Sequence, residues 1–122
     1  MRRPTMLAAI VAVLLAGLAA PAWAGYGALA RDPVTGKIGL SWDKPTPRDA
    51  ETAAMHDCST AGCKIIFRTK PRQCGAVATA ADGKGWGAAY RGGRDAAALA
   101  AMNDCQKHNT GQCKVRVVGC NR

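Results

Sequence analysis

The chain has few of the residues that most catalytic and metal sites require. It contains only two histidines, His56 and His108, and eight acidic residues against 17 basic ones. It has no Cys-x-x-Cys pair, and neither histidine stands at a spacing typical of zinc ligands. Neither is accompanied by a serine or free cysteine in a setting that would activate a nucleophile. These absences favour a non-enzymatic protein without metal or cofactor, with a small hydrolase as the weaker alternative.

A nucleotide-binding loop is also missing. The segment Gly-Lys-Gly-Trp-Gly at 83–87 lacks the GxxxxGK[ST] spacing and stands between two expected strands, not before a helix. A hairpin turn is the better interpretation. We expect no nucleic-acid partner.

One long apolar run is present, near the N-terminus. Arg2 and Arg3 precede an uncharged segment over 6–20, and Pro21 and the small-residue sequence Ala-Trp-Ala follow it. The run is shorter than a membrane span of about 20 residues and ends in a pattern typical of signal-peptidase cleavage. The sequence predicts a cleavable signal peptide over 1–24 and a single exported domain over 25–122, periplasmic or secreted. An uncleaved anchor is the alternative.

Bulky aromatic residues are scarce, so the core of this domain must be small. The chain has three tryptophans, two tyrosines and one phenylalanine. Small cores benefit from covalent constraint, and an even number of cysteines in a short exported chain is typical of a disulfide framework. We expect disulfides, with no free thiol, among Cys58, Cys63, Cys74, Cys105, Cys113 and Cys120.

An internal repeat organises the domain. Ala-Met-His-Asp-Cys at 54–58 matches Ala-Met-Asn-Asp-Cys at 101–105. Each half has the pattern strand, turn, strand, helix, strand. The predicted fold class is therefore α+β, a small disulfide-stapled domain built from two pseudo-equivalent ββαβ repeats, 27–74 and 75–120.

Turn and capping residues set the expected boundaries. Thr46 before Pro47 is typical of a helix start, and Asp82 before Gly83 is typical of a hairpin. The expected strands and helices lie at 26–31, 37–42, 47–58 and 64–69, with the second helix opening at Asp95 and the last strand at 114–118.

The repeat favours one cysteine pairing among the 15 that six cysteines allow. In each half one cysteine ends the helix and the next opens the following strand. We prefer two local bridges and a third that joins the halves: Cys58–Cys63, Cys105–Cys113 and Cys74–Cys120.

Two further pairs of residues have both a functional and a structural interpretation. Asp57 and Asp104 occupy equivalent helix positions and could act as paired carboxylates, although capping of the last helical turn is favoured. Trp86 and Tyr90 could form an aromatic binding platform, although packing over the Ala-rich helix is favoured.

Positive charge is concentrated in the second half. Without Arg2 and Arg3, 15 basic residues face eight acidic ones, a formal charge of +7. A basic face attracts polyanions. We expect the two third strands to carry equivalent basic patches, with Lys64 and Arg68 on one face and Lys114 and Arg116 on its counterpart. The candidate binding surface comprises Arg68, Lys70, Arg72, Lys114, Arg116, Trp86 and Tyr90.

The ordered motifs resemble the domain of unknown function 4189 family. They are Gly-Tyr-Gly-Ala-Leu-Ala at 25–30, Cys-Gly-Ala at 74–76, Gly-Trp-Gly at 85–87 and the closing Cys120. The resemblance covers essentially all of the chain after residue 24 and implies a small exported bacterial domain. It implies no activity.

The function predicted from these features is that of an exported, non-enzymatic binding module. We expect it to act as an inhibitor or immunity-type protein on a protein partner in the envelope or outside the cell. The alternative is a secreted basic protein that associates with anionic envelope lipids or glycans.

Overall fold

The computed structural model describes residues 25–109 and 111–122, so the predicted signal peptide lies outside the described residues. The ββαβ order occurs twice, which confirms the predicted α+β fold. The first helix begins at the expected residue, whereas the second begins one residue earlier than expected. The elements are β1 (Tyr26–Arg31), β2 (Ile38–Lys44), α1 (Pro47–Cys58), β3 (Lys64–Thr69), β4 (Cys74–Ala80), β5 (Trp86–Arg91), α2 (Arg94–His108) and β6 (Cys113–Cys120).

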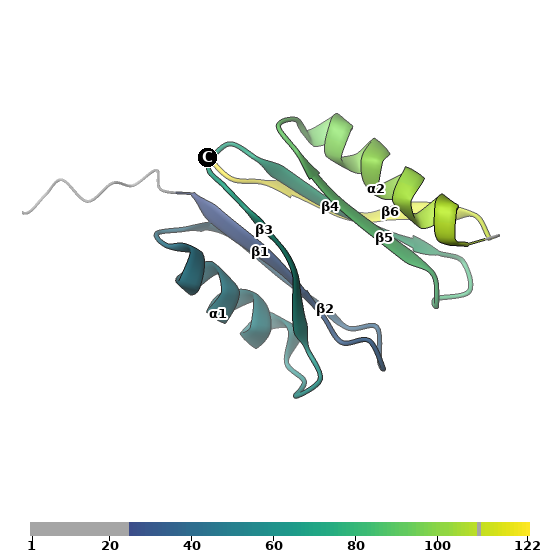
Figure 1. The fold of residues 1–122 in the computed structure, drawn as a ribbon, viewed down its shortest axis with the longest axis horizontal. Coiled ribbons are helices and arrows are strands. Elements are labelled where there is room, and N and C mark those ends of the chain that lie inside the picture. The colour runs from purple at the N-terminus through teal and green to yellow at the C-terminus, as the bar shows by residue number, and fades with distance from the viewer. Residues whose placement is uncertain (1–24, 110) are drawn as a thin grey trace, which may run out of the picture.

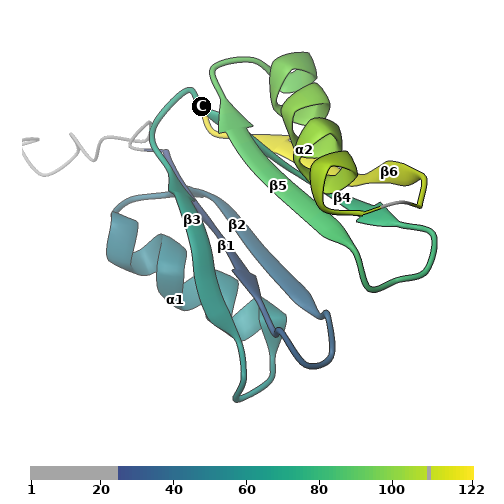
Figure 2. The same cartoon turned by 45° about the vertical axis from the view of Figure 1, so that its right-hand side comes forward.

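The strands form two antiparallel three-stranded sheets, in the orders β2-β1-β3 and β5-β4-β6. The sheets face each other, with α1 outside the first and α2 outside the second, as Figures 1 and 2 show. The result is a four-layer arrangement in which each ββαβ unit supplies one helix and one sheet.

Small residues bring each helix close to its sheet. The buried positions of α1 are Ala50, Ala54 and Cys58, and those of α2 are likewise two alanines and a cysteine. A Cβ at Gly39 would lie 2.2 Å from the carbonyl oxygen of Ala54, and a Cβ at the equivalent Gly87 would meet α2 in the same way. Because these strand positions carry no side chain, the helix backbone packs directly on the strand.

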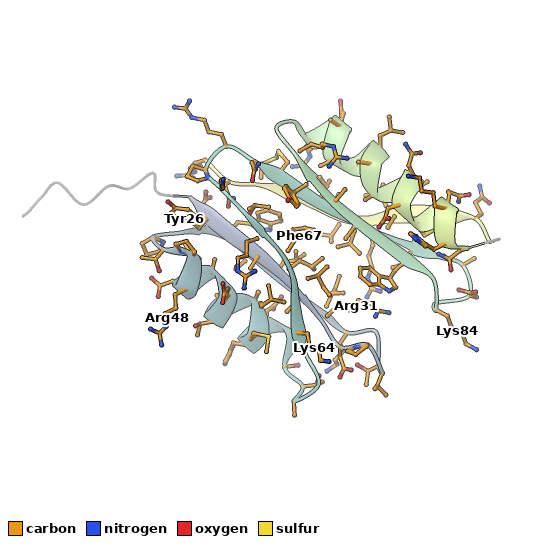
Figure 3. The ribbon with its side chains drawn as sticks, viewed as in Figure 1. Tyr26, Arg31, Arg48, Lys64, Phe67 and Lys84 are labelled. Atoms are coloured by element: carbon orange, nitrogen blue, oxygen red, sulfur yellow. A yellow bond between two sulfur atoms is a disulfide. The ribbon has the colours of Figure 1, made fainter. Side chains whose placement is uncertain are left out.

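The bulkier side chains fill the space between the sheets. Leu29 and Phe67 of the first sheet pack with Val77 of the second, all of them buried. Figure 3 shows Phe67 pointing into this layer. The indole of Trp42 lies against Gly75 and Gly119, where a Cβ would come within 3.1 Å and 2.5 Å of its ring atoms.

Trp86 and Tyr90 also face the opposite sheet, so their expected packing over the Ala-rich helix is wrong. The guanidinium of Arg31 lies 4.5 Å from the Trp86 ring centre, and the ring of Tyr90 is 5.4 Å from that of Phe67. Alternation along β5 accounts for this, because Ala89 points to the helix and its two neighbours point away from it. The cation–π contact and the aromatic pair therefore join the two units.

The three disulfides are those preferred from the repeat: Cys58–Cys63, Cys105–Cys113 and Cys74–Cys120. The third does not join the halves, which corrects the expectation. Cys74 is the first residue of β4 and pairs directly with Cys120 on the neighbouring β6. The bridge therefore lies within the second sheet, and the two units are joined by packing and by hydrogen bonds such as that from the Asn121 amide to the Thr69 hydroxyl, 2.7 Å.

A β-bulge in each third strand overturns the predicted arrangement of the basic patches. In β3, Phe67 pairs with Leu29 but Ile65 pairs with Ala30, so one extra residue reverses the alternation. Lys64 and Arg68 consequently point to opposite faces. An equivalent shift occurs in β6 between Val77 and Ala78 of its partner strand.

The bulges also change which residues correspond. Counting from the cysteine that opens each strand, Arg68 corresponds to Val118, which packs in the second helix–sheet core. Arg116 corresponds to Ile66, which is 39% exposed. Only Lys64 and Lys114 form an equivalent basic pair, and Arg68 pairs instead with Glu51 of α1.

Candidate binding site

Asp57 and Asp104 each connect a helix to the edge of its sheet. Asp57 accepts a hydrogen bond of 2.9 Å from the backbone N–H of Leu40 on β2, and Asp104 accepts one of 3.0 Å from Ala88 on β5. Each bond involves the residue that follows the glycine contacted by the helix. The two carboxylates therefore lie in separate units, where each occupies an edge N–H group, and they do not form a paired-carboxylate centre.

Beside each of these bonds, a groove runs between the helix and the outer strand. The groove between β2 and α1 has a volume of about 790 Å³, and that between β5 and α2 about 570 Å³. Ala53 lines the first groove, and Ala100, at the equivalent position of α2, lines the second. A groove therefore occurs at the equivalent position of each unit, and the second groove extends to Ile66 and Phe67 on β3 of the first unit.

The two grooves differ in chemistry. The β5–α2 groove combines the exposed apolar side chains of Ile66 and Tyr90, which are 39% and 43% exposed, with the cations Arg91 and Lys107. Its only acidic lining residue, Asp104, already accepts the Ala88 N–H. Its lining therefore combines two exposed apolar side chains with two cations.

The β2–α1 groove is more acidic, and Leu40, Trp42 and Pro45 supply its apolar lining. Asp49 and Asp57 line it together with Lys44 and His56. Trp42, which corresponds to Tyr90, is wedged against the opposite sheet. The two copies therefore suit different ligands.

The backbone edge of β5 in the second groove is already partly occupied. The Arg91 guanidinium donates a 2.7 Å hydrogen bond to the carbonyl oxygen of Tyr90, two residues beyond the N–H that Asp104 accepts. A peptide adding as a further strand would have to displace both. A ligand in this groove would therefore contact its side chains more than the backbone edge of β5.

The two histidines are far apart in the fold and have different surroundings. His56 lines the β2–α1 groove, whereas His108 lies at the end of α2, with Nδ1 2.8 Å from the carbonyl oxygen of Asp104. Within residues 25–109 and 111–122, no group of three or more His, Cys, Asp or Glu side chains could hold a metal ion. Over the same residues, no helix is long and apolar enough to cross a membrane.

Asp32 is the most perturbed carboxylate that the structure describes. Hydrogen bonds from the Thr60 hydroxyl and then from the backbone N–H of Val34 lower the pKa of Asp32 to about 2. Asp32 links the β1–β2 turn to the loop after α1 and is only 4% exposed. Its charge therefore stabilises a turn. Sequence reasoning missed this residue, although its position at the head of an Asp-Pro-x-x-Gly turn was a signal.

Of the predicted surface residues, the structure brings together only some. Tyr90 lines the β5–α2 groove, whereas Trp86 lies at the other end of β5. Lys70 and Arg72 lie in the β3–β4 turn, and Lys114 lies at the opposite end of the second sheet. The sequence did not indicate the grooves, because they depend on how close the helix lies to its sheet.

The fold and its bridges define a duplicated, disulfide-bonded ββαβ domain. The chain belongs to the family described as Domain of unknown function (DUF4189), whose sequence model matches residues 26–120. This agrees with the resemblance seen in the sequence motifs.

Similar proteins are known from mycobacteria. The chain is 37% identical over 90 residues to the uncharacterized protein Rv1813c of Mycobacterium tuberculosis, an alignment that covers 74% of this chain and 57% of the relative. It is 41% identical over 79 residues to protein Rv1269c of the same organism, covering 65% and 56%. The chain thus spans little more than half the length of these relatives.

A solved structure has the same architecture. The NMR structure of Rv1813c from M. tuberculosis superposes with a TM-score of 0.59 at 27% identity, covering 99% of this chain and 95% of that chain. The duplicated fold is therefore shared with an experimentally determined relative.

Proposed function

We propose that the protein is an exported, non-enzymatic binding module of the inhibitor or immunity type, and that its β5–α2 groove holds a segment of a protein partner. The observation that best supports this proposal is the difference between the two equivalent grooves. Trp42 packs against glycines of the opposite sheet, whereas Tyr90 contacts Phe67 and still leaves 43% of its surface exposed beside Ile66.

The lining of the groove defines the kind of partner. Ile66 and Tyr90 suit an apolar side chain, and Arg91 and Lys107 suit acidic residues on either side of it. Charge complementarity of this kind favours encounter and orientation, while apolar burial supplies affinity. The partner segment therefore carries an apolar residue flanked by aspartate or glutamate.

Export is part of this proposal. The N-terminal pattern over 1–24 and the three disulfides both support an oxidising compartment outside the cytoplasm. The intact mass of the protein recovered from the exported fraction should correspond to a chain beginning at Gly25.

The duplication provides a matched test of the groove. Ala100→Trp places a large side chain in the β5–α2 groove, and Ala53→Trp does the same in the β2–α1 groove. Each purified variant is used as bait for envelope and secreted proteins, with photo-crosslinking and quantitative mass spectrometry. Ala100→Trp should capture at least about tenfold less of the partner than the wild type, because the tryptophan fills the groove and removes the partner's central contacts.

Ala53→Trp should capture the partner as the wild type does. Both variants must retain the thermal midpoint of the wild type. If Ala100→Trp is destabilised, Arg91→Glu and Lys107→Glu replace it as the test of the β5–α2 groove. Equal capture by all variants, equal loss in both, or no groove-dependent capture would contradict the proposal.

A further inference from the structure

A second surface lies at the end of the molecule where the described chain both begins and ends. A Cβ on Gly25 would lie 2.8 Å from the carbonyl oxygen of Arg122, which also accepts the N–H of Arg72 at 3.2 Å. Figures 1 and 2 show the β2–α1, β3–β4 and β5–α2 connections at this same end. Segments distant in sequence therefore meet there.

This end is rich in cations, and we call it the basic pole. Six basic residues lie on or beside its connections and at the C-terminus, near three acidic residues, Asp43, Asp49 and Asp95. The basic residues are Lys44, Arg48, Lys70, Arg72, Arg94 and Arg122. Among the described residues, only Arg122 of these six takes part in an ion pair, 3.9 Å from Asp43.

The helix dipoles add to the positive field, and the backbone of Arg72 is in an unfavourable conformation. Both helices begin at the basic pole, so the positive ends of their dipoles point outward there. Arg72 stands at the β3–β4 turn with φ of 69°, a conformation that favours glycine or asparagine. The turn therefore holds a cation where a neutral residue would be less strained.

We infer that the basic pole binds the surface of a membrane that contains anionic phospholipid. The cations are spread over the chain end and three separate connections, and Lys70, Arg72, Arg94 and Arg122 line neither groove. A broad layer of phosphate headgroups matches such a spread better than a single peptide segment does. The predicted signal peptide also directly precedes Gly25, so this end of the domain lies nearest the bilayer during export.

The test compares charge reversal at the two ends of the molecule. The pole variant carries Arg48→Glu, Lys70→Glu and Arg72→Glu. The matched control carries Lys64→Glu, Lys84→Glu and Lys114→Glu, which removes the same charge from the opposite end. All six side chains are exposed, and Figure 3 shows Arg48 well separated from Lys64 and Lys84.

Binding of protein recovered from the exported fraction is measured by co-sedimentation with vesicles of equal parts phosphatidylglycerol and phosphatidylcholine. A surface cation contributes about fivefold in affinity, so the pole variant should bind at least about 100-fold more weakly than the wild type. The control should lose less than about tenfold. Wild-type binding should also fall as the Debye length shrinks from about 30 Å at 0.01 M salt to about 8 Å at 0.15 M.

Each contrary outcome overturns the inference. Equal weakening of the two variants would show that net charge alone attracts the protein. Equal binding to pure phosphatidylcholine would show apolar insertion. Pole-dependent binding to soluble polyglutamate without binding to vesicles would identify an acidic protein as the occupant. Ala100→Trp should bind vesicles as the wild type does, so failure of the groove proposal leaves this one standing.

Discussion

Gly87 should be one of the least substitutable residues outside the disulfides. A Cβ there would lie 2.1 Å from the Cys105 nitrogen and 2.6 Å from the Ala101 carbonyl oxygen, well inside the 3.0 Å that real contacts respect. Relief requires α2 to move by about 1 Å, yet the Cys105–Cys113 bridge and the bond between Asp104 and the edge of β5 hold that part of the helix.

We expect Gly87→Ala to cost about 3 kcal/mol, at the upper end of the overpacking range. At about 4–8 °C per kcal/mol, the thermal midpoint should fall by about 12–24 °C. Gly39→Ala should behave alike, since its Cβ would meet α1 at 2.2 Å. Gly92→Ala is the control, because a Cβ there meets nothing within 4 Å.

The assay is thermal and urea unfolding followed by far-UV circular dichroism, with the disulfides intact. Gly92→Ala should stay within about 0.5 kcal/mol of the wild type. A Gly87→Ala protein as stable as Gly92→Ala would show that the helix lies farther from β5 than described. The reasoning about close helix–sheet contact would then be refuted for both units.

Two other predictions concern the turn and the long-range bridge. Because the pKa of Asp32 is lowered to about 2, its contribution to stability is fully present above about pH 4 and is lost as pH falls through about 2. Urea unfolding over this pH range should show that Asp32→Asn removes that part of the pH dependence. Identical pH profiles for the variant and the wild type would contradict the prediction. Replacing Cys74 and Cys120 together with serine opens a loop of 46 residues and should cost about 4 kcal/mol in the chain-entropy model, whereas a loss below about 1 kcal/mol would show that the unfolded chain is already constrained.

Local patterns predicted the elements and the fold class. Thr46 and Pro47 fixed the start of α1, where the Thr46 hydroxyl accepts the N–H of Asp49 as a helix cap. The repeated Asp-Cys predicted equivalent units and the local disulfides, although Cys105 does not end its helix, because α2 continues to His108. These features depend on residues close together in the chain, which is why sequence alone was sufficient.

Features that depend on pairing between strands were less predictable. The bulges opposite Ala30 and Ala78 leave no local signal in the sequence. They reverse the alternation of side chains in β3 and β6, for example at Lys64 and Arg68, so the basic patches were predicted on the wrong faces. Cys74 was assigned to the first unit because its role as the first residue of β4 is visible only in the register. The candidate site was less predictable still, since Tyr90 was identified but the groove beside it was not.

The face-to-face packing of the two sheets has a consequence for how the protein withstands dilution. A lone ββαβ unit would expose Leu29 and Phe67, which become buried only when the second sheet covers them. Two separate units would therefore have to associate, and their pairing would weaken as their concentration fell. In a single chain the second unit is always at high effective concentration. A protein released into a large volume thus keeps its inner layer covered, however dilute it becomes.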